Sequence, residues 1–235
     1  MLDAGNTLSS GSRKDLNQWS QGRITVEAMN LMGYDAMALG PQDLTLGLEV
    51  LRERMAEAAF AIVSANLTVE GQLLAPPYVL LEREGATIAV LGLTGPPRAA
   101  MEEPVEVGDP VAAALQHFPA LADQAHLVIV LSNLGPAAER ELAQQVPRID
   151  LVVGGGAGAP QSEVAWQGAV ALVRAGGLGE YLGITEVVLG ERGSPPAVSS
   201  KSLTLGPEIM DDGEITALKT RYLQEYYAQS TGTPG

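Results

Sequence analysis

The sequence contains no cysteine and only two histidines, His117 and His126. Without cysteine the chain has no disulfide bond, no thiolate metal ligand and no cysteine nucleophile. His117 lies within a predicted helix and His126 directly precedes a predicted strand, so we interpret both as structural side chains. The absence of cysteine therefore excludes thiol chemistry of any kind for this chain.

Positive charge and long apolar runs are also scarce. The 14 Lys and Arg residues against 28 Asp and Glu residues give a formal net charge of −14. Such an acidic chain repels the phosphates of nucleic acids and anionic lipids, so we expect no nucleic-acid partner. No apolar run reaches the roughly 18 residues that a membrane-spanning helix needs, so direct membrane insertion is not expected.

The composition is otherwise that of a globular protein. The 235 residues are 46% hydrophobic and 18% charged, and only 4% are aromatic, so Ala, Val and Leu must supply most of the core. We predict one domain over residues 1–228 and a flexible tail over residues 229–235. The chain opens on "MLDAGN", which is predicted to start inside a strand without a signal peptide, and this suggests that upstream sequence is missing.

Short apolar runs alternate with amphipathic stretches, and this pattern predicts an α/β fold. The alternation up to about residue 155 favours a largely parallel sheet covered by helices, whereas the closely spaced strands after about residue 163 favour antiparallel pairing in a second sheet. Predicted strands span 1–4, 36–39, 61–66, 78–84, 87–93, 127–132, 150–153, 170–174, 184–190 and 198–205. Predicted helices span 24–32, 46–59, 110–122, 137–145 and 213–228.

Four stretches then follow one another in an ordered set: "LDAGNTLSSG" (2–11), "MNLMGYDAMALGPQDLTLG" (29–47), "VIVLSNLG" (128–135) and "IDLVVGGGAG" (149–158). Together they resemble the calcineurin-like metallophosphoesterases, and most closely the catalytic domain of the 5′-nucleotidase family. The resemblance covers nearly the whole chain. It implies a metallophosphoesterase-like α/β sandwich of two mixed β-sheets flanked by helices.

In that family the four stretches carry the metal-binding motifs Gly-Asp, Gly-Asn-His-Glu, Ser-His and Gly-His-x-His. Their side chains hold two divalent cations that activate a water molecule, and a further histidine protonates the leaving oxygen. An Asp-x-His motif on an earlier strand would lie upstream of Met1. The resemblance aligns these motifs with seven positions of this chain: Asn6, Pro41, Gln42, Asp43, Asn133, Gly156 and Gly158.

The residue types at these positions differ from those the chemistry requires. Asn6 cannot replace a carboxylate that bridges two dications, and Gly156 and Gly158 supply no ligand at all. The oxygen atoms of Asp43 and its neighbours would suit a weakly bound Mg²⁺ or Ca²⁺, but one carboxylate rarely suffices. We therefore expect these polar side chains to form hydrogen bonds within the protein instead of binding a cation. We expect no catalytic residue, no metal and no cofactor.

These expectations favour a catalytically inactive 5′-nucleotidase-like domain that acts as a structural or binding subunit of a larger assembly. Two alternatives stay open. The chain would be a phosphoester hydrolase of the 5′-nucleotidase class with a rearranged or incomplete site, or a small-ligand binding module that uses the crevice between the motifs.

The start of the chain bears on its partners. In the family another strand lies beside the one that here spans Met1–Ala4, so the resemblance implies an open sheet edge at these residues. Open edges recruit other strands, and we therefore expect a protein partner or self-association through this edge. The resemblance also favours a periplasmic or extracellular location.

Overall fold

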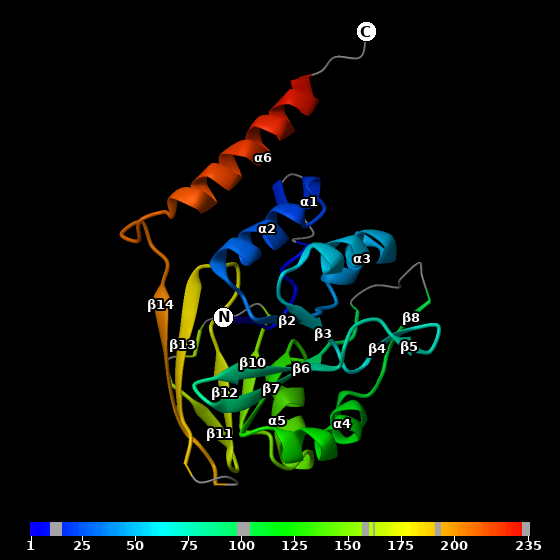
Figure 1. Ribbon diagram of the computed structural model, residues 1–235, viewed down its shortest axis with the longest axis vertical. Coiled ribbons are helices and arrows are strands. Elements are labelled where there is room, and N and C mark those ends of the chain that lie inside the picture. Colours follow the sequence, from blue (N-terminus) through cyan, green and yellow to red (C-terminus); the bar gives the residue numbers. More distant parts are fainter. Residues whose placement is uncertain (10–15, 98–103, 157–159, 162, 191–193, 232–235) are drawn as a thin grey trace.

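The computed structural model describes residues 1–9, 16–97, 104–156, 160–161, 163–190 and 194–231. Its main body is a sandwich in which two β-sheets lie between two layers of helices (Figure 1). The predicted α/β sandwich is confirmed.

The smaller of the two stacked sheets is parallel and holds β1 (Leu2–Asp3), β2 (Ala36–Ala38) and β3 (Ala61–Val63) in the order β1-β2-β3. Leu2 pairs with Ala36, and Ala38 pairs with Val63. β1 therefore forms one edge of this sheet, and within the described residues no strand pairs with its other side.

The larger sheet has six strands in the order β11-β12-β10-β9-β7-β6. Its four inner strands are parallel to one another, and the outer strands β6 and β11 are antiparallel to their neighbours. The strands are β6 (Tyr78–Arg83), β7 (Ala86–Leu93), β9 (Leu127–Ser132), β10 (Leu151–Gly154), β11 (Ala165–Gln167) and β12 (Val170–Arg174). Every residue of β9 is buried, as expected for a parallel strand covered on both faces.

Two small antiparallel sheets complete the β structure. One pairs β13 (Tyr181–Val188) with β14 (Ala197–Thr204), and the other joins β4 (Leu67–Val69) to β5 (Gln72–Leu73) and β8 (Val105–Val107).

The helices begin and end at residues suited to those places. Asp109 caps α4 (Pro110–Gln124) through the Ala112 amide, and proline fits the first turn because it lacks an N–H to satisfy. Gly33 ends α2 (Arg23–Met32) with φ 68°, a conformation that glycine adopts without strain. The others are α1 (Leu16–Trp19), the 3₁₀ helix η1 (Asp43–Leu46), α3 (Leu48–Glu57), α5 (Pro136–Gln145) and α6 (Gly213–Thr231).

The alternating direction of side chains along a strand builds three apolar layers. In β2, Met37 packs toward α2 and α3, while Ala36 and Ala38 face the larger sheet. In β9, Ile129 and Leu131 face the smaller sheet, and alternate residues such as Val130 pack under α4 and α5. The two sheets therefore share a core, and each is covered on its other face by its own pair of helices.

α6 contacts α1 and α2 and then projects away from the body (Figure 1). Trp19 meets the rings of Tyr222 and Tyr226 edge-on, at centroid distances of 6.3 and 5.5 Å. The helix runs to Thr231, so it includes residues 229–231 of the segment predicted as a flexible tail, and residues 232–235 lie outside the described ranges. Among the described residues, no helix is both long enough and apolar enough to span a membrane.

The details of the later strands differ from the prediction. β11 and β12 join the large sheet instead of starting a second one, and the hairpin of β13 and β14 forms a sheet of its own. The predicted strand 61–66 ends at Val63, because the backbone then turns and the Ser64 amide bonds to the Pro76 carbonyl. Turn geometry of this kind leaves little trace in an apolar pattern.

Candidate functional site

The residues singled out in the sequence gather where parallel strands end. Asn6 follows β1, Pro41 to Asp43 follow β2, Asn133 follows β9, and Gly156 follows β10. We call this cluster the carboxyl edge. The structure thus brings together six of the seven predicted positions, while Gly158 lies outside the described residues.

Asp43 is the most deeply buried of these residues, with no exposed surface. One carboxylate oxygen accepts hydrogen bonds from the amides of Asn6 and Gly40, both at 2.9 Å, and the other accepts from the Leu8 amide at 2.8 Å. Burial raises the pKa of Asp43 to about 6 despite these three donors, and the nearby charge of Asp3 acts in the same direction. Asp43 therefore ties the loop after β1 to the loop after β2.

Asn6 sits in the left-handed region with φ 66°, a conformation that asparagine tolerates better than most residues. Its side-chain oxygen accepts a hydrogen bond from the Gln42 amide at 2.8 Å. Gly40 packs directly against the same side chain, and any larger residue there would collide with it. The amide of Asn6 thus fills the space between the two loops.

Asn133 joins the two sheets. Its Nδ2 donates to the carbonyls of Ala4 and Leu39, both at 3.0 Å, and its Oδ1 accepts from the Gly95 amide at 2.7 Å. All of these partners are backbone groups from three different strand ends. Asn133 therefore acts as a bracket between β1, β2 and β7.

Two groups at the carboxyl edge were missed in the sequence. Asp3 accepts hydrogen bonds from the Gly5 amide at 2.8 Å and from Thr7 Oγ1 at 2.7 Å, and burial raises its pKa. Arg174, at the end of β12, forms an ion pair with Glu139 of α5. An arginine that ends the otherwise apolar run "VALVR" was the available signal for the second group.

The side chains at the carboxyl edge do not fit a di-metal centre. Asp43, Asn6 and Asn133 direct their oxygen atoms at backbone amides, and an oxygen that accepts such bonds is poorly placed to bind a cation as well. Within the described ranges, no three His, Asp or Glu side chains converge as a ligand set. These oxygen atoms thus belong to a hydrogen-bond network that joins the backbone of neighbouring loops.

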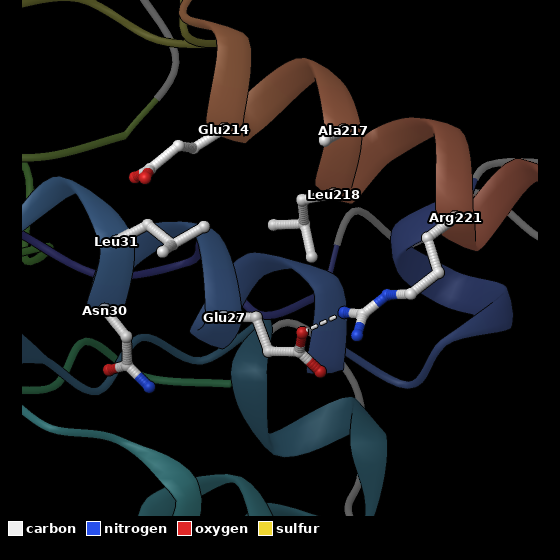
Figure 2. A pocket seen from close by; sticks show the side chains of 7 residues that line it. All are labelled: Glu27, Asn30, Leu31, Glu214, Ala217, Leu218 and Arg221. Atoms are coloured by element: carbon white, nitrogen blue, oxygen red, sulfur yellow. Dashed lines mark hydrogen bonds and ion pairs between the residues drawn. The ribbon is translucent and has the colours of Figure 1, made fainter.

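A separate groove lies between α2 and α6 (Figure 2), with a volume of about 680 Å³. It is lined by Glu27, Asn30, Leu31, Glu214, Ala217, Leu218 and Arg221. Glu27 forms an ion pair with Arg221 across the groove and accepts a hydrogen bond of 2.7 Å from the Tyr222 hydroxyl. None of the predicted site residues lines this groove, so it is distinct from the carboxyl edge.

Comparison with known proteins agrees with this architecture, although no protein-family model matches the chain. The calcineurin-like phosphoesterase YfkN of Bacillus subtilis superposes with a TM-score of 0.77 at 20% identity, over 95% of this chain and 82% of its own. The 5′-nucleotidase precursor of Thermus thermophilus gives a TM-score of 0.81 at 25% identity, over 98% of this chain and 50% of its own. A snake venom 5′-nucleotidase of Gloydius brevicauda is 27% identical over 244 residues, which cover 90% of this chain and 42% of that protein.

The two stacked sheets with their helical layers are thus the fold of the calcineurin-like phosphoesterases. Similarity in sequence as well as structure points to one group within that class, because the chain is similar to 5′-nucleotidases over 90% or more of its length. The predicted resemblance to the 5′-nucleotidases is confirmed. The chain spans half or less of the length of these 5′-nucleotidases.

Proposed function

We propose that this chain is a catalytically inactive member of the 5′-nucleotidase family that acts as a structural or binding subunit of a larger assembly. The observation that carries the proposal is the commitment of Asn6, Asp43 and Asn133 to backbone hydrogen bonds. Because the oxygen atoms of these side chains already accept backbone hydrogen bonds, a metal ion or a catalytic water would compete with those bonds for them. The carboxyl edge therefore holds the loops together and performs no chemistry.

Metal content and turnover test this proposal directly. We expect less than stoichiometric Zn, Mn or Fe in purified protein after dialysis, and background hydrolysis of nucleotides and generic phosphodiesters. Two metal ions per chain would contradict it. So would a turnover that purifies with the protein, is abolished by Asn133→Ala and survives Glu214→Gln, a matched change in the distant groove.

The named activity of the relatives supports the competing hypothesis of a phosphoester hydrolase with a rearranged site. The same measurement separates the two hypotheses. A third hypothesis, a small-ligand module at the carboxyl edge, requires polar atoms free to meet a ligand, and the hydrogen bonds of Asn133 argue against it.

The partner of such a subunit is proposed to be another protein that adds a strand beside β1. The support is the position of β1 at the edge of its sheet within the described residues, because an edge strand offers a row of backbone donors and acceptors. Two copies of a chain with net charge −14 repel each other, so a different and less acidic partner is favoured over self-association. Light scattering on the isolated chain tests this, and a soluble monomer with cooperative unfolding that captures no added strand peptide would count against it.

The location of the protein is proposed to be periplasmic or extracellular. The support is that relatives of the chain include enzymes named from snake venom, which is a secretion. Fractionation of the native source with an antibody against the folded domain tests the proposal, and recovery in the cytosolic fraction would contradict it.

A further inference from the structure

One positively charged side chain lies inside the carboxyl edge. Arg174 ends β12 and pairs in register with Gly154, the last residue of β10. Its Nη1 donates to the carbonyl of Gly155, and its Nη2 donates to the carboxylate of Glu139. The side chains of Arg174 and Glu139 are only 9% and 5% exposed, so this ion pair is buried.

The ion pair is connected to the neighbouring strand as well. The second carboxylate oxygen of Glu139 accepts a hydrogen bond of 3.1 Å from Ser132 Oγ, which in turn accepts from the Leu134 amide at 3.2 Å. Arg174 therefore links β12, the loop after β10, helix α5 and the end of β9. The charge sits where the loop carrying Gly156 leaves the sheet.

Glycines at the end of β10 and the start of the next loop leave room for the guanidinium of Arg174. A methyl group placed on Gly154 would lie 2.5 Å from Arg174 Nη2 and 2.8 Å from Glu139 Oε2, and one placed on Gly156 would lie 3.9 Å from Arg174 Nη1. A divalent cation brought to this loop would meet a fixed positive charge at close range, in surroundings that screen it poorly. It would also find the Glu139 carboxylate and the Gly155 carbonyl already bonded.

We propose that Arg174 is the resident cation of the carboxyl edge: its guanidinium neutralises Glu139, holds the loop after β10 and excludes divalent metals. This inference rests on the proposed lack of a metal centre and gives it a cause in the chain itself. Because the positive charge is covalently attached, the start of this loop at Gly155 stays anchored whatever the supply of metal ions. Replacing Gly156 by a histidine would then not be enough to restore metal binding at this loop.

The chain contains a matched control. Arg54 of α3 is equally buried, with a side chain 6% exposed, and also forms ion pairs. Its partners Glu53 and Glu57 are 58% and 37% exposed, so water can solvate them when Arg54 is removed. Glu139 has no such access. Removal of Arg174 leaves a buried and uncompensated carboxylate, whereas removal of Arg54 does not.

The experiment compares thermal unfolding of the full chain and four variants with EDTA and with millimolar Mn²⁺. We expect no effect of Mn²⁺ on the original chain. Arg174→Gln should lower the melting temperature by roughly 10 °C, and Mn²⁺ should recover part of that loss by taking the place of the guanidinium. The melting temperature should fall less in two further variants. One is Arg174→Lys, which keeps the positive charge, and the other combines Glu139→Gln with Arg174→Gln, which removes both charges. Arg54→Gln should also lower the melting temperature by less than Arg174→Gln does, and Mn²⁺ should not raise it again.

Each other outcome has a meaning. If Arg174→Gln unfolds within about 2 °C of the original chain, or if Mn²⁺ stabilises Arg54→Gln equally, the inference is overturned. If Arg174→Gln does not fold, folding of both the Lys variant and the double variant supports the inference, and failure of either overturns it. Mn²⁺ bound stoichiometrically by the original chain would defeat the proposed function too, whereas an unresponsive Arg174→Gln with a metal-free original chain defeats this inference alone.

Discussion

The carboxyl edge and the α2–α6 groove both contain carboxylates and amides, but those groups bond to different partners. At the carboxyl edge, Asp43 and Asn133 bond to backbone amides and carbonyls from several strands. In the groove, Glu27 bonds mainly to other side chains, among them the half-exposed Arg221. The difference shows that the position of a polar residue at a strand end does not make it available to a ligand. A polar side chain is available to a ligand only when its atoms do not already form hydrogen bonds with the backbone.

The largest effect should come from Asp43→Ala. The change removes the acceptor of three buried backbone amides and leaves them without partners, so we expect a loss of roughly 3–5 kcal/mol in the free energy of unfolding. Urea denaturation measures the loss. Glu214→Ala in the groove is the matched control and should leave stability nearly unchanged, because that side chain is exposed. Equal effects of the two variants would remove the distinction between the two regions.

Asn133→Ala should come next. It leaves the carbonyls of Ala4 and Leu39 and the amide of Gly95 unpaired at the junction of the sheets, and we expect a loss of roughly 2–4 kcal/mol. Asn30 in the groove is a close match, since its amide also bonds to backbone groups, the Glu57 carbonyl and the Ala59 amide, but at an exposed place. Asn30→Ala should cost about 1 kcal/mol in the same assay. A larger loss for Asn30→Ala than for Asn133→Ala would mean that burial is not the deciding factor.

Stability should depend on pH in a direction that is unusual for a carboxylate. The pKa of Asp43 is raised from 3.8 to about 6 in the folded chain, so between these values the folded state binds more protons than the unfolded state. The free energy of unfolding should therefore fall as pH rises from about 4 to about 6, by on the order of 2–3 kcal/mol, and then level off. The raised pKa values of Asp3 and Asp150 act in the same direction.

Urea denaturation at several pH values measures this dependence, with Asp43→Asn as the control. The variant should be less stable at low pH, because an amide N–H would face backbone donors, but its stability should vary less across the window. Identical pH profiles for the two chains would show that Asp43 does not titrate in this range.

The sequence allowed the layers and the strand ends to be predicted because both depend on local pattern. "LVIVL" is a continuous apolar run, and β9 is buried at every residue. In the structure Asn6, Asp43 and Asn133 of the ordered motifs follow neighbouring strand ends, since parallel strands present the same end to the same edge.

The sequence did not show what these side chains contact. Whether Asn133 faces a crevice or bonds to Ala4, Leu39 and Gly95 depends on how the two sheets pack against each other. Arg174 and Glu139 are far apart along the chain, and nothing in either local pattern indicates that they pair. Long-range pairs of this kind come from the tertiary fold, which periodicity does not encode.

The smallest effect should come from Arg221→Gln in the groove. Its guanidinium lies 5.1 Å above the Tyr222 ring and pairs with Glu27, but the Arg221 and Glu27 side chains are 53% and 30% exposed, so water and salt screen the attraction. We expect a loss of less than about 1 kcal/mol that shrinks further at high salt.

Tyr222→Phe should cost more than Arg221→Gln, because the Tyr222 hydroxyl is buried and bonds to Glu27. Urea denaturation at low and high salt measures both. A loss above about 2 kcal/mol for Arg221→Gln, insensitive to salt, would show that the ion pair is shielded from water, and the groove would then resemble the carboxyl edge more than its exposure suggests.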